Sequence, residues 1–253
     1  MNVIGIIPAR LKSTRLPEKM LVKINGRCLI EYVYLNALKC KSIKKLYVAT
    51  DNVKIKNVIE KAGGNVIMTS KKCKSGTERI CEAVLKLKLN SNDVIVNVQG
   101  DEPLLEPNLI DRTVKMMRED NHCDVVTLAS PVKNMDEMND TSVVKVVISN
   151  DGYALYFSRA SIPFSRDGRH PNGDFLLKHK GLYTYRKGVL DMFPKYKSKY
   201  ENVEKLEQLR ILENGCKIKV VIAQSNSIGI DTKKDVEEFR KALNKRKKAE
   251  SKA

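Results

Sequence analysis

Four cationic side chains follow the first apolar run of the chain, which covers residues 3–7. These cations are Arg10, Lys12, Arg15 and Lys19. In open α/β sheets, ligands bind outside the carboxyl ends of the strands, so we expect these cations to converge on a polyanion. The stretch lacks the glycine-rich patterns of P-loops and dinucleotide sites, so side chains must hold the anion. The pattern predicts a bound triphosphate, and a solvated basic turn is the alternative.

An acidic segment, residues 99–103, follows a second apolar run at 94–98. Because Asp101 then lies at the end of a strand and faces the cationic loop, it is suited to hold Mg²⁺ against nucleotide phosphates. An ordinary acidic turn is the alternative. One carboxylate makes a weak magnesium site, so a second is expected. Asp231 supplies it, or else caps the helix that follows, and the residues alone favour neither role.

A small polar turn at residues 74–79 opens a predicted helix. Its amides and the hydroxyls of Ser75 and Thr77 can bind a base or a phosphate at the positive end of that helix. The same groups can instead cap the helix. Taken alone, the turn therefore adds a weak indication of a nucleotide site.

Apolar runs that alternate with helical patterns must position these groups. In the first half we expect strands at 3–7, 45–50, 66–69, 94–98 and 125–128, and helices at 29–38, 53–62, 78–87 and 108–119. Such alternation predicts βαβ units and a mostly parallel sheet covered on both faces. In the second half we expect a hairpin of strands 143–148 and 154–158, a polar loop at 165–174, a strand at 176–185 and helices at 203–213 and 233–245, the last capped by Thr232. The fold class expected is therefore α/β with a mixed sheet.

The 253 residues, 42% of them hydrophobic, are enough for one large domain. No apolar run approaches the roughly 20 residues that span a bilayer, and the first residues enter an apolar run rather than a charged leader. We therefore expect a cytoplasmic protein without membrane insertion. The scattered cysteines form no zinc pattern and are expected to be reduced and structural. They are Cys28, Cys40, Cys73, Cys81, Cys123 and Cys216.

The net charge of +17 raises the possibility of a nucleic-acid-binding protein. Much of this charge lies at the end of the last predicted helix and in a basic tail at 246–253. Other lysines are spread over helices and loops instead of gathering with aromatic residues on one face. Incidental binding of polyanions is expected, but a dedicated nucleic-acid site is not supported.

Several segments occur in an order that resembles the 3-deoxy-D-manno-octulosonate (Kdo) cytidylyltransferases, the CMP-Kdo synthetases. They are Pro8-Ala9-Arg10, Ser13-Thr14-Arg15-Leu16-Pro17, Val48-Ala49-Thr50-Asp51, Ser75-Gly76-Thr77-Glu78-Arg79, Asn97-Val98-Gln99-Gly100-Asp101-Glu102-Pro103, Tyr153-Ala154-Leu155-Tyr156-Phe157-Ser158-Arg159 and Leu206-Glu207-Gln208-Leu209-Arg210. Each segment alone is unspecific, but their joint occurrence is specific. The resemblance reaches from residue 1 to about residue 243.

The resemblance implies a nucleotidyltransferase fold, Rossmann-like and GT-A-like. Its mixed, mostly parallel sheet would be flanked by helices and joined to a less regular lobe for sugar binding and dimerisation. One domain would cover 1–245, with a CTP-binding half at 1–130, a sugar-binding and dimerisation half at 131–245, and the basic tail outside. It further implies a homodimer, to which strands 143–148 and 154–157 would contribute.

The activity implied by the resemblance is transfer of CMP from CTP to Kdo, which releases pyrophosphate and activates the sugar for lipopolysaccharide synthesis. Asp101 and Asp231 would bind Mg²⁺. Arg10, Arg15 and Lys19 would stabilise the leaving pyrophosphate, so that these three and Asp101 are the expected catalytic residues. The expected nucleotide-binding residues are Pro8, Ala9, Arg10, Ser13, Arg15, Lys19, Ser75, Thr77 and Gln99.

For the sugar acid, Arg159 is the expected partner of the carboxylate. Tyr183, Glu207 and Gln208 are expected to bind hydroxyls, and His179 occupies a position that the family uses near the sugar. The chain departs from the family pattern at Glu18 and at residues 200–204. An amino-Kdo or another 2-keto acid sugar is therefore an alternative acceptor, because one hydrogen-bonding group can decide specificity. A nonulosonic acid or an alditol phosphate is a more distant alternative.

Overall fold

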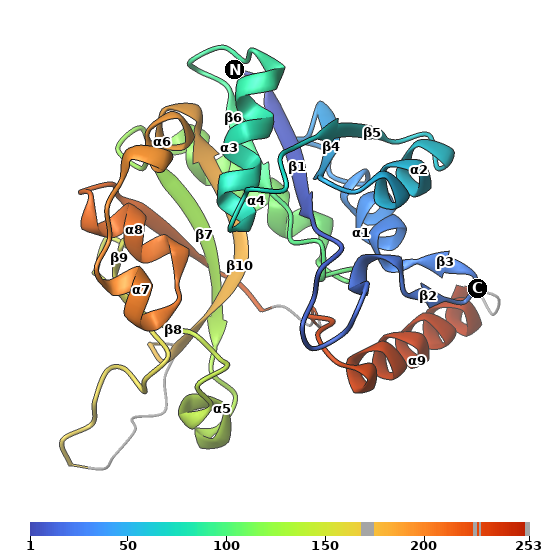
Figure 1. Ribbon diagram of the computed structural model, residues 1–253. Coiled ribbons are helices and arrows are strands. Elements are labelled where there is room, and N and C mark those ends of the chain that lie inside the picture. The colour runs from blue at the N-terminus through green and yellow to red at the C-terminus, as the bar shows by residue number, and fades with distance from the viewer. Residues whose placement is uncertain (168–174, 225–226, 228, 251–253) are drawn as a thin grey trace.

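A nine-stranded mixed sheet forms the centre of the computed structural model, which describes residues 1–167, 175–224, 227 and 229–250 (Figure 1). Seven strands form a continuous path in the order β11-β7-β10-β6-β1-β4-β5, and β8 and β9 extend it beside β10. Their bounds are β1 Val3–Ala9, β4 Lys45–Thr50, β5 Asn65–Met68, β6 Val94–Asn97, β7 Val125–Pro131, β8 Lys145–Ile148, β9 Ala154–Ser158, β10 Leu177–Arg186 and β11 Ile218–Ile222.

The strands of the first half are parallel to one another. β1 pairs in parallel with both β4 and β6, and β4 pairs in parallel with β5. β10 lies antiparallel between β6 and β7, so the second half of the chain inserts its longest strand into the sheet of the first. The prediction of a mixed, mostly parallel sheet is confirmed. β11, parallel to β7, is absent from the predicted strands.

Helices cover both faces of the sheet. They are α1 Leu29–Ala37, α2 Val53–Lys61, α3 Gly76–Leu87, α4 Pro107–Glu119, α5 Met135–Asn139, α6 Lys187–Met192, α7 Tyr200–Glu204, α8 Glu207–Glu213 and α9 Lys233–Glu250. Two 3-10 turns, η1 Lys19–Leu21 and η2 Phe193–Lys195, and a hairpin of β2 Lys23–Ile24 and β3 Arg27–Cys28 complete the described elements. The single helix predicted at 203–213 is wrong, because Lys205 adopts a left-handed conformation (φ 55°) and separates α7 from α8. Within the described chain, no helix has both the length and the apolar character that crossing a bilayer requires.

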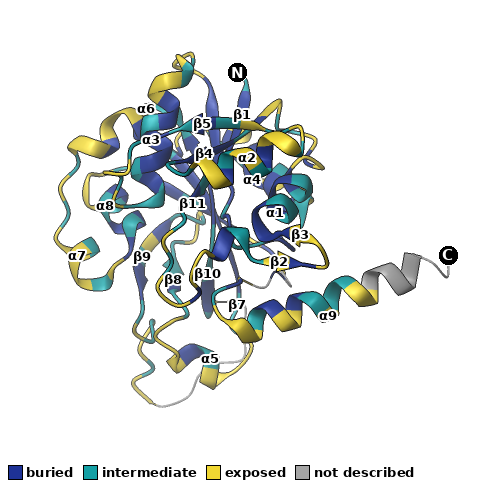
Figure 2. Ribbon diagram, turned by 45° about the vertical axis from the view of Figure 1, so that its right-hand side comes forward, coloured by how far each residue is buried: buried dark blue, intermediate teal, exposed yellow. Residues whose placement is uncertain are grey.

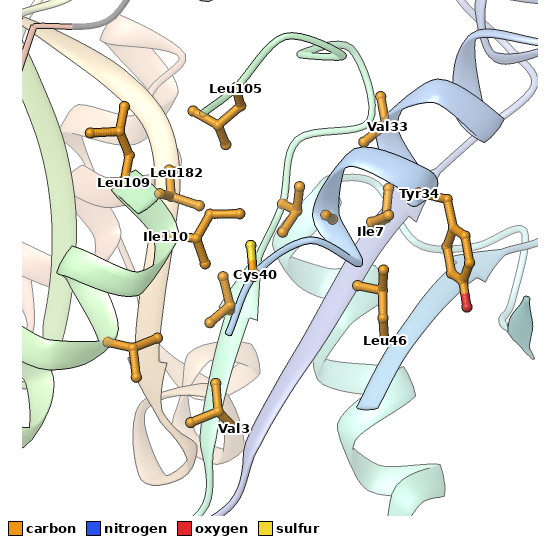
Figure 3. Packing of buried hydrophobic residues seen from close by; sticks show 14 of the residues in the cluster. Val3, Ile7, Val33, Tyr34, Cys40, Leu46, Leu105, Leu109, Ile110 and Leu182 are labelled. Carbon is orange, nitrogen blue, oxygen red and sulfur yellow. The ribbon is translucent and has the colours of Figure 1, made fainter. Parts of the chain in front are cut away.

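The side chains on the two faces of β1 belong to two separate clusters of buried residues. Val3 and Ile7 pack with α1, α2 and α4, and Figure 3 shows Ile7 beside Val33 and Tyr34 of α1. Ile4 and Ile6 point to the other face, where α3, α6 and α8 pack. The strand is buried along almost its whole length, as expected for a parallel strand covered on both sides (Figure 2).

A third, smaller cluster holds the cationic loop against the last helix. Leu16 of the loop, Leu104 and Ile230 pack with Val236 and Phe239 of α9. Figure 1 accordingly shows α9 beside the β2–β3 hairpin, beneath the loop that follows β1. Since three distant segments of the sequence meet in this cluster, it fixes the positions of the polar residues beside them, which include Arg15 and Asp231.

Candidate active site

A cavity of about 510 Å³ opens at the carboxyl ends of β1 and β6. Every site residue predicted from the sequence lines it, except Arg159. Its charged lining consists of the cations Arg10, Lys12, Arg15, Lys19, Lys74, Arg79 and Lys205 and the carboxylates Asp101, Glu207 and Asp231. The cations outnumber the carboxylates, as a site for a polyanion such as a triphosphate requires.

The cationic loop starts where β1 ends at Ala9 and closes at η1. Glu18, directly before η1, adopts a left-handed conformation (φ 50°) that is uncommon for residues with a side chain. The turn directs Lys19 inward, and only 7% of this residue is exposed. By contrast, the side chain of Arg15 is 67% exposed, so the loop offers one buried cation and others that are open to a ligand.

The buried cation joins the two predicted metal ligands. Lys19 Nζ donates to Asp101 Oδ2 at 2.7 Å and to Asp231 Oδ1 at 3.0 Å, and Arg15 Nη2 lies 2.9 Å from Asp231 Oδ2. The backbone supports this arrangement, because the amide of Ile230 donates to the carbonyl of Asp101 at 2.8 Å. Two carboxylates separated by 130 positions in the sequence are thereby held around one ammonium group.

The side chain of Asp231 is not the cap of α9. Instead, the carboxylate of Asp235 accepts hydrogen bonds from the amides of Asp231 at 2.9 Å and Thr232 at 2.7 Å. The Thr232 hydroxyl accepts from the amide of Asp235 at 3.3 Å, so these two residues form a reciprocal cap. Asp231 is therefore free of the capping role and turns its carboxylate toward Lys19.

The donor set around Lys19 suits a magnesium ion bound together with a nucleotide. Mg²⁺ is usually held by one or two carboxylates, with phosphates and water completing its shell. Asp101 and Asp231 supply two such carboxylates beside cations that can hold phosphates, and the ammonium between them marks where positive charge is favourable. Among the described residues there is no group of three or more metal-binding side chains, so an all-protein cage is not formed here.

Gly100 and Gln99 shape the wall opposite the loop. A Cβ on Gly100 would lie 3.2 Å from both the Met20 sulfur and the carbonyl oxygen of Pro8, so only glycine lets the segment approach β1 this closely. Gln99 Nε2 donates to the carbonyl of Gly181 at 2.8 Å, at an irregularity in the register of β10. Gln99 thus links the segment that follows β6 to β10.

At the start of α3, the cavity-lining groups also serve the helix. Ser75 Oγ accepts from the amide of Glu78 at 3.2 Å, so Ser75 caps α3. The same hydroxyl donates to Glu207 Oε2 at 2.7 Å, and the amide of Thr77 donates to that oxygen at 3.2 Å. The capping interpretation of the turn is therefore confirmed, and its polar groups also hold Glu207 at the cavity. Binding of a base or a phosphate by the turn stays a prediction.

Aromatic rings form the neutral end of the cavity. Tyr183 stacks on Tyr185, and His179 lies between Tyr183 and Phe157, with ring centroids 5.1 to 5.6 Å apart. Burial lowers the pKa of His179 to about 3, with a smaller contribution from the Lys180 charge, so the imidazole is neutral. Burial likewise raises the pKa of Tyr183 well above its usual value, so its hydroxyl stays protonated.

One hydrogen bond fixes the ring of His179. Its Nε2 lies 2.9 Å from Thr127 Oγ1, and that hydroxyl also approaches the carbonyl of Leu182 at 2.7 Å. Because a hydroxyl has only one proton to give, donation to Leu182 makes Thr127 an acceptor for Nε2–H. The assignment leaves Nδ1 of the neutral ring as a hydrogen-bond acceptor.

Arg159 lies away from the cavity lining. Its Nε donates to the carbonyl of Glu204 at 2.8 Å and its Nη1 to the carbonyl of Thr141 at 3.0 Å, while its amide donates to the carboxylate of Glu204. These contacts tie the end of β9 to α7. The role of Arg159 as a sugar ligand stays a prediction, which this arrangement does not support.

Several lining residues were not among the predicted site residues, and three of the polar ones are Lys205, Lys74 and Asn97. Lys205 lines the cavity from its left-handed position between α7 and α8. No pattern in the sequence indicates that a lysine adopts this conformation here. Lys74 belongs to the turn that was singled out, but its side chain was not assigned. Asn97, at the end of β6, is 2% exposed and its Oδ1 has no hydrogen-bond partner among the described residues. The sequence signal that could have identified Asn97 is its position as a polar residue at the end of an apolar strand.

Comparison with known proteins gives a consistent result. The family model described as "Cytidylyltransferase" matches residues 4–218. An "8-amino-3,8-dideoxy-manno-octulosonate cytidylyltransferase" of Shewanella pealeana is 44% identical over 239 residues, covering 93% of this chain and 96% of the relative. A "3-deoxy-manno-octulosonate cytidylyltransferase" of Thermodesulfovibrio yellowstonii is 43% identical over 254 residues, covering 96% and 99%.

Two solved structures extend the comparison. A CMP:2-keto-3-deoxy-manno-octonic acid synthetase in complex with CTP superimposes with a TM-score of 0.91 at 34% identity, over 97% of this chain and all of the other. A 4-diphosphocytidyl-2C-methyl-D-erythritol synthase from Anaerococcus prevotii shares the fold alone, with a TM-score of 0.62 at 18% identity over 96% of both chains.

Proposed function

Because the chain belongs to the cytidylyltransferase family, we propose that it transfers CMP from CTP to an eight-carbon 2-keto-3-deoxy sugar acid of the Kdo type and releases pyrophosphate. The observation that carries this proposal is the cavity itself. A cationic loop and a pair of carboxylates form one end of it, and neutral hydrogen-bonding aromatic residues form the other. The solved structure of a related protein, 34% identical, is a complex with CTP.

The cationic end suits the triphosphate of CTP. Arg10, Lys12 and Arg15 line the cavity along the loop, where they can contact the β- and γ-phosphates. The oxygen of the sugar hydroxyl then attacks the α-phosphorus in line and the hydroxyl proton is released to water, while the bond to pyrophosphate breaks and negative charge grows on this leaving group. Cations fixed in advance by the loop stabilise this charge in the transition state, so positioning and electrostatics supply most of the rate.

Asp101 and Asp231 would hold Mg²⁺ in this account. When bound, the ion would polarise the phosphoryl oxygens and neutralise charge on the triphosphate. The protein contributes the geometry: the bond between Ile230 and Asp101 keeps the two carboxylate segments together, and Gly100 allows the close approach of Asp101 to the loop.

The aromatic end suits the sugar acid. Tyr183 and the neutral His179 provide a hydroxyl and an acceptor nitrogen, and Gln208, which is 4% exposed, adds an amide. Glu207 is anchored by Ser75 and Thr77 and can accept from sugar hydroxyls with its remaining lone pairs. With Arg159 outside the lining, Lys205 is the cation on α7–α8 that we propose for the sugar carboxylate.

Kdo and its 8-amino analogue are the two candidate acceptors for this end of the cavity. Relatives of similar identity carry both names, so the comparison alone does not separate them. We propose Kdo as the primary acceptor and the 8-amino sugar as the alternative. A site built to bind a substrate hydroxyl or amine can reject the analogue strongly, because its buried polar groups lose their partners.

A competition experiment tests the assignment. Purified protein is mixed with CTP, Mg²⁺ and equal concentrations of the two sugars, and the two CMP-sugars are quantified by mass spectrometry. A product ratio of at least about 10 in favour of CMP-Kdo supports the primary acceptor. A ratio reversed in favour of the 8-amino product replaces it, and the absence of both products rejects the proposed function.

We further propose that the protein is a homodimer located in the cytoplasm. β8 and β9 lie at an edge of the sheet, and Leu155 on β9 is 63% exposed although it is apolar. A second copy that covers this edge would bury it. Sedimentation at micromolar concentration is expected to show a dimer, and a monomer at all concentrations would reject this assembly.

A further inference from the structure

We propose that Lys19 acts as an internal substitute for the divalent cation. In the protein without nucleotide, its ammonium group occupies the space between Asp101 and Asp231 and excludes the metal. An arriving triphosphate attracts the ammonium away from the carboxylates, and only then does the metal site open. This inference rests on the proposed function, because the triphosphate and the metal are its two ligands.

The contacts of Lys19 carry the first step. Its Nζ lies 2.7 Å from one carboxylate and 3.0 Å from the other, and its side chain is 9% exposed. A Mg²⁺ ion would require oxygen ligands at about 2.0 to 2.1 Å in nearly octahedral geometry. Because the ammonium already bridges an oxygen of each carboxylate, a dication cannot take the same place beside it. Metal binding therefore requires the ammonium to move.

The charge of the cluster supports the second step. Lys19 and Arg15 offset the charges of Asp101 and Asp231, so the cluster is electrically balanced without a metal. Loss of the ammonium would leave the two carboxylates facing each other, with only the contact to Arg15, whose side chain is 67% exposed, as compensation. Such a pair strongly favours another cation. Lys19 thus keeps the carboxylates assembled and at the same time lowers their affinity for a metal.

The cavity beside Lys19 offers its ammonium group a second position, next to the phosphates of a bound nucleotide. The other cations of the loop line the same cavity, where the phosphates would lie within reach of a flexible four-carbon side chain. The backbone is held meanwhile: the left-handed Glu18 precedes Lys19, and Met20 packs against the glycine segment beside Asp101. Rotation of the side chain alone can therefore transfer the ammonium from the carboxylates to a phosphate.

Binding of Mn²⁺ in the absence of any nucleotide tests the inference, because it does not depend on turnover. Free Mn²⁺ is measured by electron paramagnetic resonance during a titration of the wild-type protein, Lys19→Gln and Lys19→Arg. Lys19→Gln removes the charge and is expected to bind Mn²⁺ about 10- to 100-fold more tightly. Lys19→Arg keeps a cation and is expected to bind Mn²⁺ as weakly as the wild-type protein.

Lys12→Gln is the matched control, since Lys12 lies in the same loop and no ion pair is recorded for it among the described residues. Equal tightening in Lys12→Gln and Lys19→Gln would mean that the overall charge of the loop is responsible, and would overturn the inference. An unchanged or weaker affinity of Lys19→Gln would also overturn it. The proposed function would still stand if the wild-type protein formed a CMP-sugar.

Thermal unfolding covers the case in which Lys19→Gln is poorly folded. Without its ammonium, the facing carboxylates destabilise the fold, and a divalent cation should reverse this. We expect Mg²⁺ to raise the melting temperature of Lys19→Gln more than that of the wild-type protein, while K⁺ at matched ionic strength does not. Failure of Mg²⁺ to stabilise the variant more than the wild-type protein would overturn the inference.

Discussion

The two ends of the cavity are built from different interactions. At the end formed by the loop after β1, ion pairs dominate, and a buried lysine is held by two carboxylates. At the end formed by β10 and α8, aromatic rings, a neutral imidazole and a protonated tyrosine hydroxyl dominate. In the proposed function, the charged end would hold the triphosphate of CTP. The neutral end would supply the directional hydrogen bonds that distinguish one sugar from another.

This difference predicts how each end should respond to mutation. Changes at the charged end should reduce the transfer step for every acceptor alike, because all acceptors share the same phosphates. Changes at the neutral end should alter the KM of the sugar and the preference between sugars, with a smaller effect on CTP.

The largest effect is expected from Asp101→Asn. The amide removes one charge from the proposed metal site and one partner of Lys19, so kcat should fall by about 10² to 10³ for Kdo and 8-amino-Kdo equally. Steady-state pyrophosphate release measures this, and circular dichroism checks that the fold is intact. Asp136→Asn on α5, outside the cavity lining, is the control. A folded variant that keeps full activity would refute the metal assignment.

A smaller and more selective effect is expected from Glu207→Gln. The amide keeps one acceptor oxygen, which can accept from both Ser75 and Thr77 as Oε2 does, but it loses the charge that strengthens both bonds. We expect the KM of the sugar to rise about tenfold while the KM of CTP changes less than about threefold. Initial rates with each substrate varied in turn measure the two constants. If the KM of CTP rises as much as that of the sugar, Glu207 belongs to the nucleotide end.

The neutral end also predicts a pH dependence of stability. Because the native pKa of His179 is about 3 and the ordinary value is 6.5, the unfolded chain takes up a proton at this residue before the native protein does. Its contribution to stability is complete above about pH 6.5 and declines as the pH falls toward 3. When the pH is lowered from about 7.5 to about 5, the melting temperature of His179→Gln should therefore fall less than that of the wild-type protein.

Calorimetry at the two pH values measures the melting temperatures of His179→Gln and the wild-type protein. His122→Gln, in the exposed turn after α4, is the control and should follow the wild-type protein. An identical decline in the wild-type protein and His179→Gln would mean that the imidazole is not held neutral by burial.

The smallest effect on activity is expected from removal of residues 246–253. The buried residues that hold α9, Val236 and Phe239, lie before this segment, so the cavity should be unaffected. The affinity of weak, salt-dependent RNA binding should fall, because this segment contributes part of the net charge of +17. Fluorescence anisotropy with RNA and pyrophosphate release measure the two properties. Tight RNA binding that survives the deletion would favour a nucleic-acid function.

The charged end could be predicted well from the sequence because its residues follow strands directly. Arg10 and Lys19 come after β1, and Asp101 comes after β6, and parallel strands bring their carboxyl ends to one edge. Only Asp231 was ambiguous. Its role depends on Asp235, which takes over the cap, and two acidic residues near a helix start do not reveal which of them does so.

The neutral end could be predicted only in part because it depends on local conformations. His179 and Tyr183 reach the cavity on either side of a register irregularity in β10, and the left-handed Lys205 divides a predicted helix in two. Arg159 was assigned by charge alone, but the Glu204 backbone and side chain draw it toward α7. β11, in contrast, was missed although its β-branched run after a glycine turn is an ordinary strand signal.

The most direct test of the central claim is the dependence of pyrophosphate release on both substrates. The protein is assayed with Mg²⁺ and each of the four nucleoside triphosphates, with and without Kdo and 8-amino-Kdo. We expect release only when CTP and one of these sugar acids are both present. Release from CTP without an acceptor, equal release from all four nucleotides, or no release with either sugar would contradict the assignment as a cytidylyltransferase for an octulosonate sugar acid.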